Sequence, residues 1–281
     1  MSNSMRTIVV TSANSRTGRH LLPRLADRGS HVIALTRTPE DLPADEVIPD
    51  WTRSPEATKA IANASAVIHL SGVFAARDEE SYEVGNVATA RLVAEAAGPS
   101  CRPVYVSYVA ADSAHPNWYV RSKGRAEDVL RRSGTDSVIF RIHPIAGGRQ
   151  APSPFELMFR QARPDAPVRV IGDGTQRFRP VHADDVVDAL IKAAEGAGRT
   201  GTYDLVGPSE FTVTEMVERI NGRSVPIERV SVEQAASMPW PPPTVADLLA
   251  HPDAPADPDA VAEIFGLSPT RVEATWPLAS A

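Results

Sequence analysis

Short apolar runs alternate with longer amphipathic stretches over the first half of the chain. β-Branched and other apolar residues predict strands at residues 7–10, 31–37, 66–70, 103–109 and 137–142. Between them, apolar residues recur every three or four positions, which predicts helices at residues 18–29, 54–64, 84–97 and 121–134. Strands that alternate with helices of this length require right-handed crossovers between parallel strands. We therefore expect an α/β fold with a doubly wound parallel sheet of the Rossmann type.

Residues typical of helix starts support this pattern at three places. Ser54 followed by Pro55 is typical of a helix start, and Thr212 with Glu215 fits a capping box. Asp184 or Asp185 is expected to cap the helix that follows residue 182.

The second half of the chain has a different character. A Gly-Asp-Gly turn at 172–174 precedes a strand-like stretch, and prolines crowd the chain after residue 232. This proline-rich tail is either a surface linker or a lid, and Trp240 within it is either an apolar wall or a packing residue. We expect a dinucleotide-binding domain at 1–145 and a smaller, partly interleaved substrate lobe at 146–281.

The stretch VVTSANSRTGRHLL (9–22) has the strand, turn and helix order of a dinucleotide site, but Ser12 and Ser15 stand where glycines are usual. Gly18 is retained for close packing of helix on strand, and the helix N-terminus attracts a phosphate. Ser12 is expected to hold a positive φ at a cost of about 1 kcal/mol, and Ser15 to turn its hydroxyl toward the pyrophosphate. Taken alone, the turn is equally consistent with a functional dinucleotide site and with one that no longer binds a dinucleotide. The residues expected to bind cofactor are Ser12, Asn14, Ser15, Arg16, Thr17 and Gly18.

Two charged residues bear on the choice of cofactor: Arg37 after the second strand, and Asp50 after a third, short strand. Arg37 follows the second strand, where a guanidinium suits a 2′-phosphate, and Arg16 is expected to reach the same group. Two cations there favour NADP over NAD. The alternative interpretation of Arg37 is a solvated surface residue with no role in cofactor binding. Asp50 either accepts from the adenine amine or caps a turn.

The clearest chemical signal is Tyr119 with Lys123 in WYVRSKGRAE. A spacing of four places both on one helix face, about one turn apart. An ammonium beside a phenol favours the phenolate, so we expect a lowered pKa for Tyr119 and a general acid–base for a carbonyl or hydroxyl.

Composition narrows the class of protein. The net charge is −6, which argues against nucleic acid as a partner. The lone Cys101 excludes an internal disulfide or a multi-cysteine metal site, and no histidine pair has metal-ligand spacing. No apolar run approaches membrane-spanning length. We expect a cytoplasmic protein with a small-molecule substrate, no metal and no membrane contact; the sequence leaves the oligomeric state open.

Several segments, taken in order, resemble extended and atypical short-chain dehydrogenase/reductases, including the NAD-dependent epimerase/dehydratase enzymes and the NmrA-like NADP-binding proteins. They are 9–22, AVIHLSG (66–72), NVATARLV (86–93), VYVSYVA (104–110), YVRSKGRAE (119–127) and RPVHADDVVDAL (179–190). The resemblance implies Tyr119 as catalytic acid–base with Lys123 as its partner, and Arg37 on the NADP phosphate. It also implies that Ser71 and Gly72 line the cofactor cleft and that Pro144 starts the nicotinamide-side loop.

One departure from the family bears on the activity. Val109 stands where the family has a serine or threonine that binds the substrate carbonyl, with Ser107 one strand repeat earlier and Tyr108 between them. Ser107 or Tyr108 is expected to substitute. Three hypotheses follow: an NADP-dependent oxidoreductase or epimerase/dehydratase-like enzyme, a regulatory protein that binds dinucleotide without turnover, and a non-redox cyclase or dehydratase. His182 with Asp184 and Asp185 is expected to be structural, and His69 to be a core histidine.

Overall fold

The computed structural model describes residues 6–148, 152–251 and 256–277 of the chain. They form two compact units, one of Met1–Val73, Asp78–Arg141 and Val187–Tyr203, and one of Phe74–Arg77, Ile142–Val186 and Asp204–Ala281. The chain passes between the units several times. The functions expected of 1–145 and 146–281 stay predictions.

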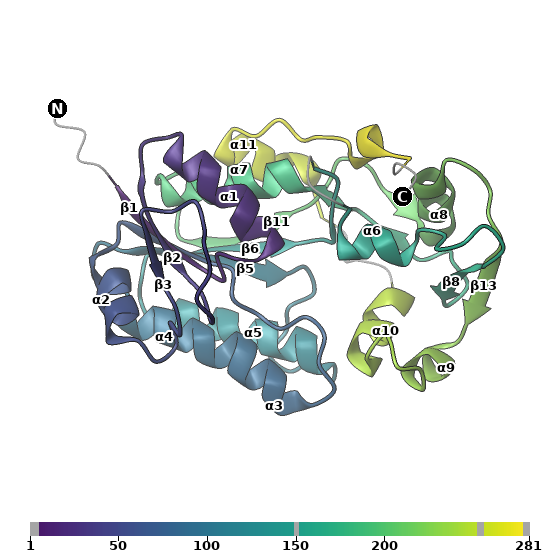
Figure 1. The fold of residues 1–281 in the computed structure, drawn as a ribbon, viewed down its shortest axis with the longest axis horizontal. Coiled ribbons are helices and arrows are strands. Elements are labelled where there is room, and N and C mark those ends of the chain that lie inside the picture. Colours follow the sequence, from purple (N-terminus) through teal and green to yellow (C-terminus); the bar gives the residue numbers. More distant parts are fainter. Residues whose placement is uncertain (1–5, 149–151, 252–255, 278–281) are drawn as a thin grey trace. The chain divides into compact units, whose positions relative to one another are not determined.

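The first unit is built on a seven-stranded sheet of order β11-β6-β5-β4-β1-β2-β3 (Figure 1). Strands β1, β2, β3, β4 and β5 pair in parallel register. The chain runs outward from β1 to β3 and then returns to β4 beside β1, so the strand order reverses between β1 and β4. Ligands bind at the carboxyl ends of strands at such a switch point. The strands are β1 (Thr7–Thr11), β2 (His31–Leu35), β3 (Glu46–Ile48), β4 (Ala66–His69), β5 (Arg102–Tyr108), β6 (Val138–Ile142) and β11 (Gly201–Leu205).

Helices cover both faces of this sheet, which confirms the doubly wound α/β fold. Figure 1 shows α2, α4 and α5 against one face and α1 and α7 against the other. An ion pair between Arg24 and Asp188 joins α1 to α7. The helices are α1 (Arg16–Ala26), α2 (Pro55–Asn63), α3 (Glu79–Tyr82), the π-helix η1 (Glu83–Ala88), α4 (Thr89–Ala96), α5 (Trp118–Arg132) and α7 (Ala183–Ala194).

The apolar periodicity that predicted these elements builds the core. Val9 and Val67 on the central strands pack with Ile61 of α2 and Val93 of α4, all almost fully buried. A second cluster joins Tyr105 of β5 to the inner face of α5. Burial of such side chains stabilises the layers by about 25 cal/mol per Å² of apolar surface.

The expected helix starts are mostly correct. Ser54 caps α2 with Pro55 in the first turn, and Thr212 and Glu215 form a complete capping box. The cap expected from Asp184 or Asp185 is wrong, because α7 already begins at Ala183. His182 does this work instead, since its Nδ1 accepts from the backbone N–H of Asp184 at 3.2 Å.

The second unit pairs short strands in twos and packs them with helices. β7 (Ile145–Ala146) pairs with β10 (Val181–His182), β9 (Arg177–Phe178) with β12 (Phe211–Thr212), and β8 (Val168–Ile171) with β13 (Ile227–Val230). Its core is rich in aromatic rings and includes Phe155, Phe178, Phe211 and Met216. The helices are α6 (Pro154–Met158), α8 (Val213–Asn221), α9 (Val232–Ala236), α10 (Pro243–Ala250), α11 (Pro258–Phe265) and the 3₁₀ helix η2 (Val272–Thr275).

The proline-rich tail is largely helical, with prolines at helix starts. Pro243 and Pro258 occupy first-turn positions of α10 and α11, where a missing N–H costs nothing. Arg77 donates to the backbone carbonyls of Met238 and Pro239, while Trp240 is 55% exposed. Residues 252–255 of the tail lie outside the described residues.

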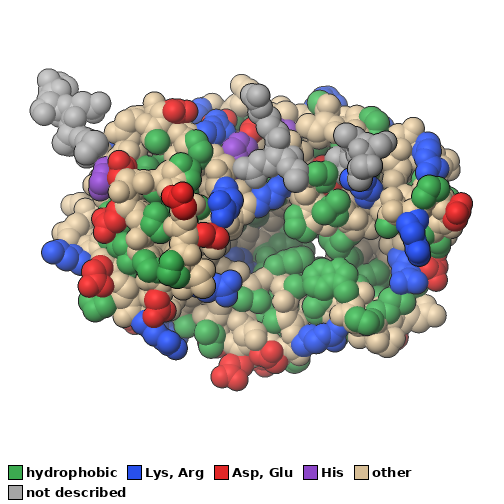
Figure 2. Space-filling model, viewed as in Figure 1, with side chains coloured by type: hydrophobic (Ala, Val, Ile, Leu, Met, Phe, Trp, Pro, Cys, Tyr) green, Lys and Arg blue, Asp and Glu red, His purple; other side chains and the backbone are tan. Residues whose placement is uncertain are grey.

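Two properties of the described residues bear on partners. Within these ranges, the structure contains no helix long and apolar enough to cross a membrane. Figure 2 shows acidic and basic side chains interspersed over the visible face, rather than gathered by sign.

Candidate functional site

The turn after β1 adopts the strained backbone expected of it. Ser12 has a φ of 46°, in the left-handed region that glycine occupies without cost. Its Oγ lies 2.9 Å from the Oγ of Ser71, which follows β4. The expected positive φ is confirmed, and the hydroxyl that replaces a glycine hydrogen binds the neighbouring strand's loop.

Ser15 is the N-cap of α1, and its Oγ accepts from the backbone N–H of Gly18 at 3.1 Å. The sequence predicts that this hydroxyl faces a pyrophosphate. In the structure the Ser15 oxygen instead accepts a hydrogen bond from an N–H in the first turn of its own helix. The hydroxyl proton remains able to donate, because a serine oxygen accepts and donates at once. Asn14, Arg16 and Thr17 lie partly buried in the same turn.

Gly18 is required by close packing of α1. A Cβ at this position would lie 2.3 Å from the carbonyl oxygen of Ala13. The close approach predicted from the sequence is therefore present, and it fixes the helix N-terminus against the end of β1.

Thr11 ties the ends of β1 and β4 together. Its buried Oγ1 accepts from the backbone N–H groups of Leu70 at 3.0 Å and Ser71 at 3.1 Å, and lies 2.9 Å from His69 Nδ1. Burial lowers the pKa of His69 to about 3, so its ring is neutral. His69 is thus a core residue, as expected, and it holds the two loops at the switch point in fixed register.

Arg37 and Asp50 lie beside this turn. The N–H of Ala13 donates to the carbonyl of Leu35 at 3.2 Å, and the N–H of Asp50 donates to the carbonyl of Arg37 at 3.3 Å. Both side chains are exposed, and Asp50 has a φ of 47°. The structure therefore brings the two residues together with the phosphate-side turn; their contacts with a cofactor stay predictions.

Tyr119 is positioned by a side-chain cap and by two aromatic rings. The Asn117 carboxamide oxygen accepts from the backbone N–H of Tyr119 at 3.0 Å, and so fixes the first turn of α5. The Tyr119 ring centroid lies 5.2 Å from that of Tyr108 and 6.1 Å from that of Tyr82. Burial, with Tyr82 adding to the effect, raises the pKa of Tyr119. The expected lowering by Lys123 is wrong in direction.

Lys123 points toward β5 and the loop after β4. Its Nζ donates to the carbonyl of Val106 at 2.6 Å and lies 4.4 Å from the centre of the Tyr105 ring. A Cβ added to Gly72 would come within 3.8 Å of this nitrogen. Burial lowers the pKa of Lys123 to about 7, while the charge of Glu127 acts to raise it.

Ser107 does not take the role expected of it. It is 2% exposed, and its hydroxyl donates to Oε1 of the buried Glu127 at 2.5 Å. That proton is bound inside the unit and is not presented to a substrate carbonyl. Tyr108, whose ring contacts Tyr119, remains the candidate hydroxyl from this strand end.

Asn86 is a site residue to which the sequence gave no role. It lies in η1, and π-helical turns are frequent at functional sites. Its Nδ2 donates to Ser122 Oγ at 2.8 Å and to the Val73 carbonyl at 3.1 Å, and its Oδ1 accepts from the Val73 N–H at 2.6 Å. Asn86 therefore fixes the loop after Gly72 against α5. The only local signal was its place in a segment that resembles the family.

One protein family accounts for both this geometry and most of the chain. The model of the RmlD substrate binding domain matches residues 5–244. The chain belongs to this family. It is thereby a member of the extended short-chain dehydrogenase/reductase superfamily, as its sequence motifs indicated.

Curated proteins similar to this member of the superfamily include one NADH dehydrogenase subunit and two reductases. The chain is 31% identical over 235 residues to subunit 9 of the NADH dehydrogenase 1 alpha subcomplex of Arabidopsis thaliana, covering 77% of this chain and 58% of that protein. It is 29% identical over 194 residues to ceramide reductase of Caulobacter vibrioides, covering 66% and 59%. It is 27% identical over 223 residues to a UDP-2-acetamido-2,6-beta-L-arabino-hexul-4-ose reductase of Pseudomonas aeruginosa, covering 76% and 56%. The matched part thus spans 56–59% of the length of these relatives.

Solved structures confirm the fold. UDP-glucuronic acid 4-epimerase of Bacillus cereus, in complex with UDP-glucuronic acid and NAD, has a TM-score of 0.74 at 20% identity over 95% of this chain and 96% of that one. The enzyme WbmH of Bordetella bronchiseptica, in complex with NAD, has a TM-score of 0.75 at 19% identity over 96% and 95%. At this identity the likeness shows the fold.

Some of the predicted residues are not part of the first unit. Pro144, like His182 and Asp184, belongs to the second unit, and its role at the nicotinamide stays a prediction. His182 Nε2 lies 3.1 Å from the Gly148 backbone nitrogen, and Asp185 accepts from the N–H and hydroxyl of Thr270, so both residues pack within the second unit. Within the described ranges, no group of three or more His, Cys, Asp or Glu residues could hold a metal.

Proposed function

We propose that this chain is an NADP-dependent oxidoreductase or epimerase/dehydratase-like enzyme acting on a small carbonyl or hydroxyl compound. The observation that carries the proposal is the position of Tyr119 and Lys123 on α5. Lys123 Nζ stands near Gly72 in the loop after β4, at the switch point of the sheet. Ligands of doubly wound folds bind at this edge.

The residues around the switch point fit a nicotinamide dinucleotide. The N-terminus of α1, where the helix dipole favours an anion, begins directly after the turn that follows β1. Gly18 lets α1 pack directly on Ala13, and Gly72 leaves no side chain beside Lys123. Arg16 and Arg37 would hold the 2′-phosphate, and Lys123 the ribose. When bound, the dinucleotide supplies or accepts a hydride.

Tyr119 is the proposed proton donor. Because burial raises its pKa, the phenol stays protonated at neutral pH, which suits donation to a carbonyl oxygen during reduction. Tyr108, against the Tyr119 ring, would orient the same oxygen. In the oxidative direction the phenol must first lose its proton, so we expect that direction to be favoured at alkaline pH.

The proposed substrate is defined by its reacting group. The reductases and the epimerase to which the chain is similar are named for ceramide, a hexulose and UDP-glucuronic acid. We propose a compact, partly apolar substrate with a carbonyl or hydroxyl carbon, and a cytoplasmic location.

Cofactor choice provides the test of the proposed Arg37 contact. Arg37→Ala should weaken NADPH binding about tenfold or more, because it removes a charge-assisted contact to the 2′-phosphate. NADH, which has no 2′-phosphate, should bind about as before. Calorimetric titration of both dinucleotides into both proteins measures this. Equal weakening of NADPH and NADH would contradict the assignment.

A second function is favoured by one specific observation. The Ser107 hydroxyl donates its hydrogen bond to Glu127 and not to a substrate. A protein that binds dinucleotide as a signal, without turnover, accounts for this loss. It predicts NADPH binding with no oxidation across a panel of carbonyl compounds. A non-redox cyclase or dehydratase would convert its substrate with no net change in NADPH.

Restoring the two missing glycines tests the turn itself. In the Ser12→Gly/Ser15→Gly protein, the first glycine would hold φ 46° without strain, and the N–H of Gly18 would be released from its cap. We expect NADPH to bind about fivefold tighter, as one hydrogen bond of about 1 kcal/mol allows. Loss of the cap to glycine costs only a few tenths of a kcal/mol, about 0.3. If the folded double variant shows no NADPH binding, the turn is not a phosphate cradle.

A further inference from the structure

Glu127 is a buried carboxylate that the proposed chemistry leaves unexplained. It lies one helical turn after Lys123 on α5 and is completely shielded from solvent. Burying a carboxylate is costly unless it is paired and hydrogen-bonded. Because Glu127 lies on the same face of α5 as Lys123, its charge acts on the lysine.

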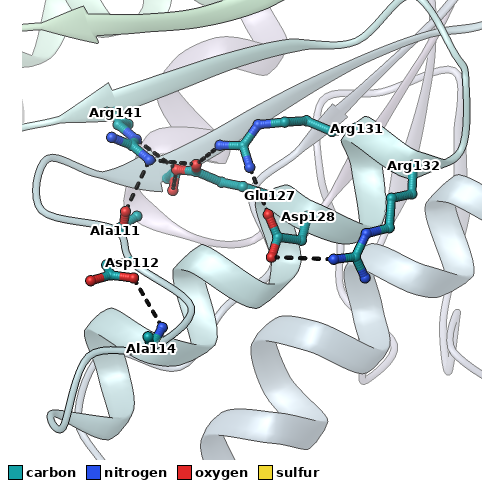
Figure 3. A network of polar contacts seen from close by, with 9 residues as sticks. Ala111, Asp112, Ala114, Glu127, Asp128, Arg131, Arg132 and Arg141 are labelled. Carbon is teal, nitrogen blue, oxygen red and sulfur yellow. Dashed lines mark hydrogen bonds and ion pairs between the residues drawn. The ribbon is translucent and has the colours of Figure 1, made fainter.

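Three side chains hold this carboxylate rigidly, and Figure 3 shows the two arginines among them. Arg141 donates through Nε to Oε1 at 3.0 Å and through its terminal nitrogen to Oε2 at 2.8 Å, a bidentate geometry. Arg131 pairs with it from the next turn, and Ser107 donates to Oε1. Arg141 is itself anchored by donating to the Ala111 carbonyl at 2.9 Å. These contacts therefore fix the position of the Glu127 carboxylate one helical turn after Lys123.

Tyr105 supplies the second fixed group near Lys123. The ammonium lies 4.4 Å from the centre of its ring, within the range of cation–π attraction. The ring is held by stacking on neutral His69 at 5.3 Å. Its hydroxyl is buried and has no hydrogen-bond partner among the described residues, so the ring face is what this side chain offers.

We propose that Glu127 and Tyr105 are positioning residues for Lys123. Glu127, one helical turn away, favours the charged form of the ammonium, and the Tyr105 ring holds it at the carboxyl end of β5, facing the loop after β4. The role rests on the proposed use of Lys123 toward the cofactor. The groups that act on Lys123 from the neighbouring elements are Tyr105 and the Val106 carbonyl of β5, neutral His69 of β4, and Glu127 of α5.

The experiment follows the ionisation of Lys123 directly, without any cofactor. The lysines of the chain are Lys59, Lys123 and Lys192, so a protein labelled with [¹³C]lysine gives few ε-methylene signals, assigned with Lys59→Arg and Lys192→Arg. The pKa of Lys123 should lie near 7. In Glu127→Gln it should fall by about half a unit or more, because an attractive charge is lost. Asp128→Asn, which removes the neighbouring carboxylate bound to Arg131, is the matched control and should leave it unchanged.

The sign of the shift separates positioning from simple structural support. If Glu127 served only to hold α5 in place, its loss would admit water and raise the pKa of Lys123 toward its ordinary value. Tyr105→Leu should lower the pKa by about half a unit or more, whereas Tyr105→Phe, which keeps the ring face, should not. Tyr105→Leu also keeps the proposal testable if Glu127→Gln does not fold.

Two results would overturn the proposal. One is an unchanged or raised pKa of Lys123 in folded Glu127→Gln, and the other is the same pKa of Lys123 in Tyr105→Leu and Tyr105→Phe. Neither result depends on whether the protein binds NADPH. Failure of this positioning role is therefore distinguishable from failure of the proposed enzymatic function, which the cofactor titrations test separately.

Discussion

Tyr119→Phe is expected to lower turnover about 10²- to 10⁴-fold while NADPH binding stays within about twofold of the unchanged protein. The variant removes only the phenolic oxygen, so the ring keeps its packing against Tyr108 and Tyr82. Loss of a proton donor affects the reacting oxygen and not the cofactor's phosphates. Steady-state kinetics with a converted carbonyl substrate, together with calorimetric titration of NADPH, measure the two quantities.

Tyr82→Phe is the matched control for Tyr119→Phe. It removes a phenolic oxygen from the ring that neighbours Tyr119 and leaves the proposed donor in place, so turnover should change far less. If Tyr119→Phe also leaves turnover unchanged, the protein does not use this phenol, and the binding protein without turnover becomes the better account.

Gly18→Ala is expected to destabilise the fold by about 2 kcal/mol or more and to abolish measurable NADPH binding. The added Cβ would lie 2.3 Å from the carbonyl oxygen of Ala13, and a backbone atom there cannot move aside as a flexible side chain can. Helix α1 must shift, and its N-terminus is the proposed phosphate site. Denaturant unfolding and calorimetric titration of NADPH measure the two effects.

Gly201→Ala is the control for Gly18→Ala, because a Cβ at Gly201 meets its nearest neighbour, Tyr203, at 3.6 Å, which is ordinary contact. Its stability should change by less than about 1 kcal/mol. A Gly18→Ala protein as stable as Gly201→Ala, with unchanged NADPH affinity, would show that the close packing of α1 is not needed.

The fold was largely predictable because apolar periodicity is a local property of the chain. Strands such as β1 and β4 and helices such as α2 and α8 begin where their β-branched runs and caps indicated. The start of α7 was missed because two adjacent acidic residues resemble a cap, whereas the acceptor is the imidazole of His182 just before the helix. The residue that caps α7 was therefore decided by the three-dimensional position of the His182 ring and not by local sequence preference.

The site was predictable as a set of residues but not as a set of interactions. The turn at Ser12 and the pair Tyr119–Lys123 could be found from spacing, since each lies within one local element. The role of Ser107 could not, because it depends on Glu127, twenty positions later. A glutamate on a polar helix looks solvent-facing in sequence. The cost of burying it is offset by Arg141 from β6, together with Ser107 and Arg131.

The ionisation of Tyr119 shows the same limit. Sequence spacing implied that Lys123 acts on the phenol, but the ammonium donates to Val106 and lies over Tyr105. Burial then dominates and raises the pKa of the phenol. Which neighbour a long flexible side chain selects is set by the strand packed beneath the helix.

The β1–α1 turn, although it lacks two glycines, is proposed to bind NADP(H). Calorimetric titration of the unchanged protein with NADPH and with NADH tests it most directly. We predict saturable binding of NADPH at about one molecule per chain, tighter than NADH by about tenfold or more because of Arg16 and Arg37. Absence of binding of either dinucleotide at about millimolar concentration, about −4 kcal/mol in binding free energy, would contradict the account.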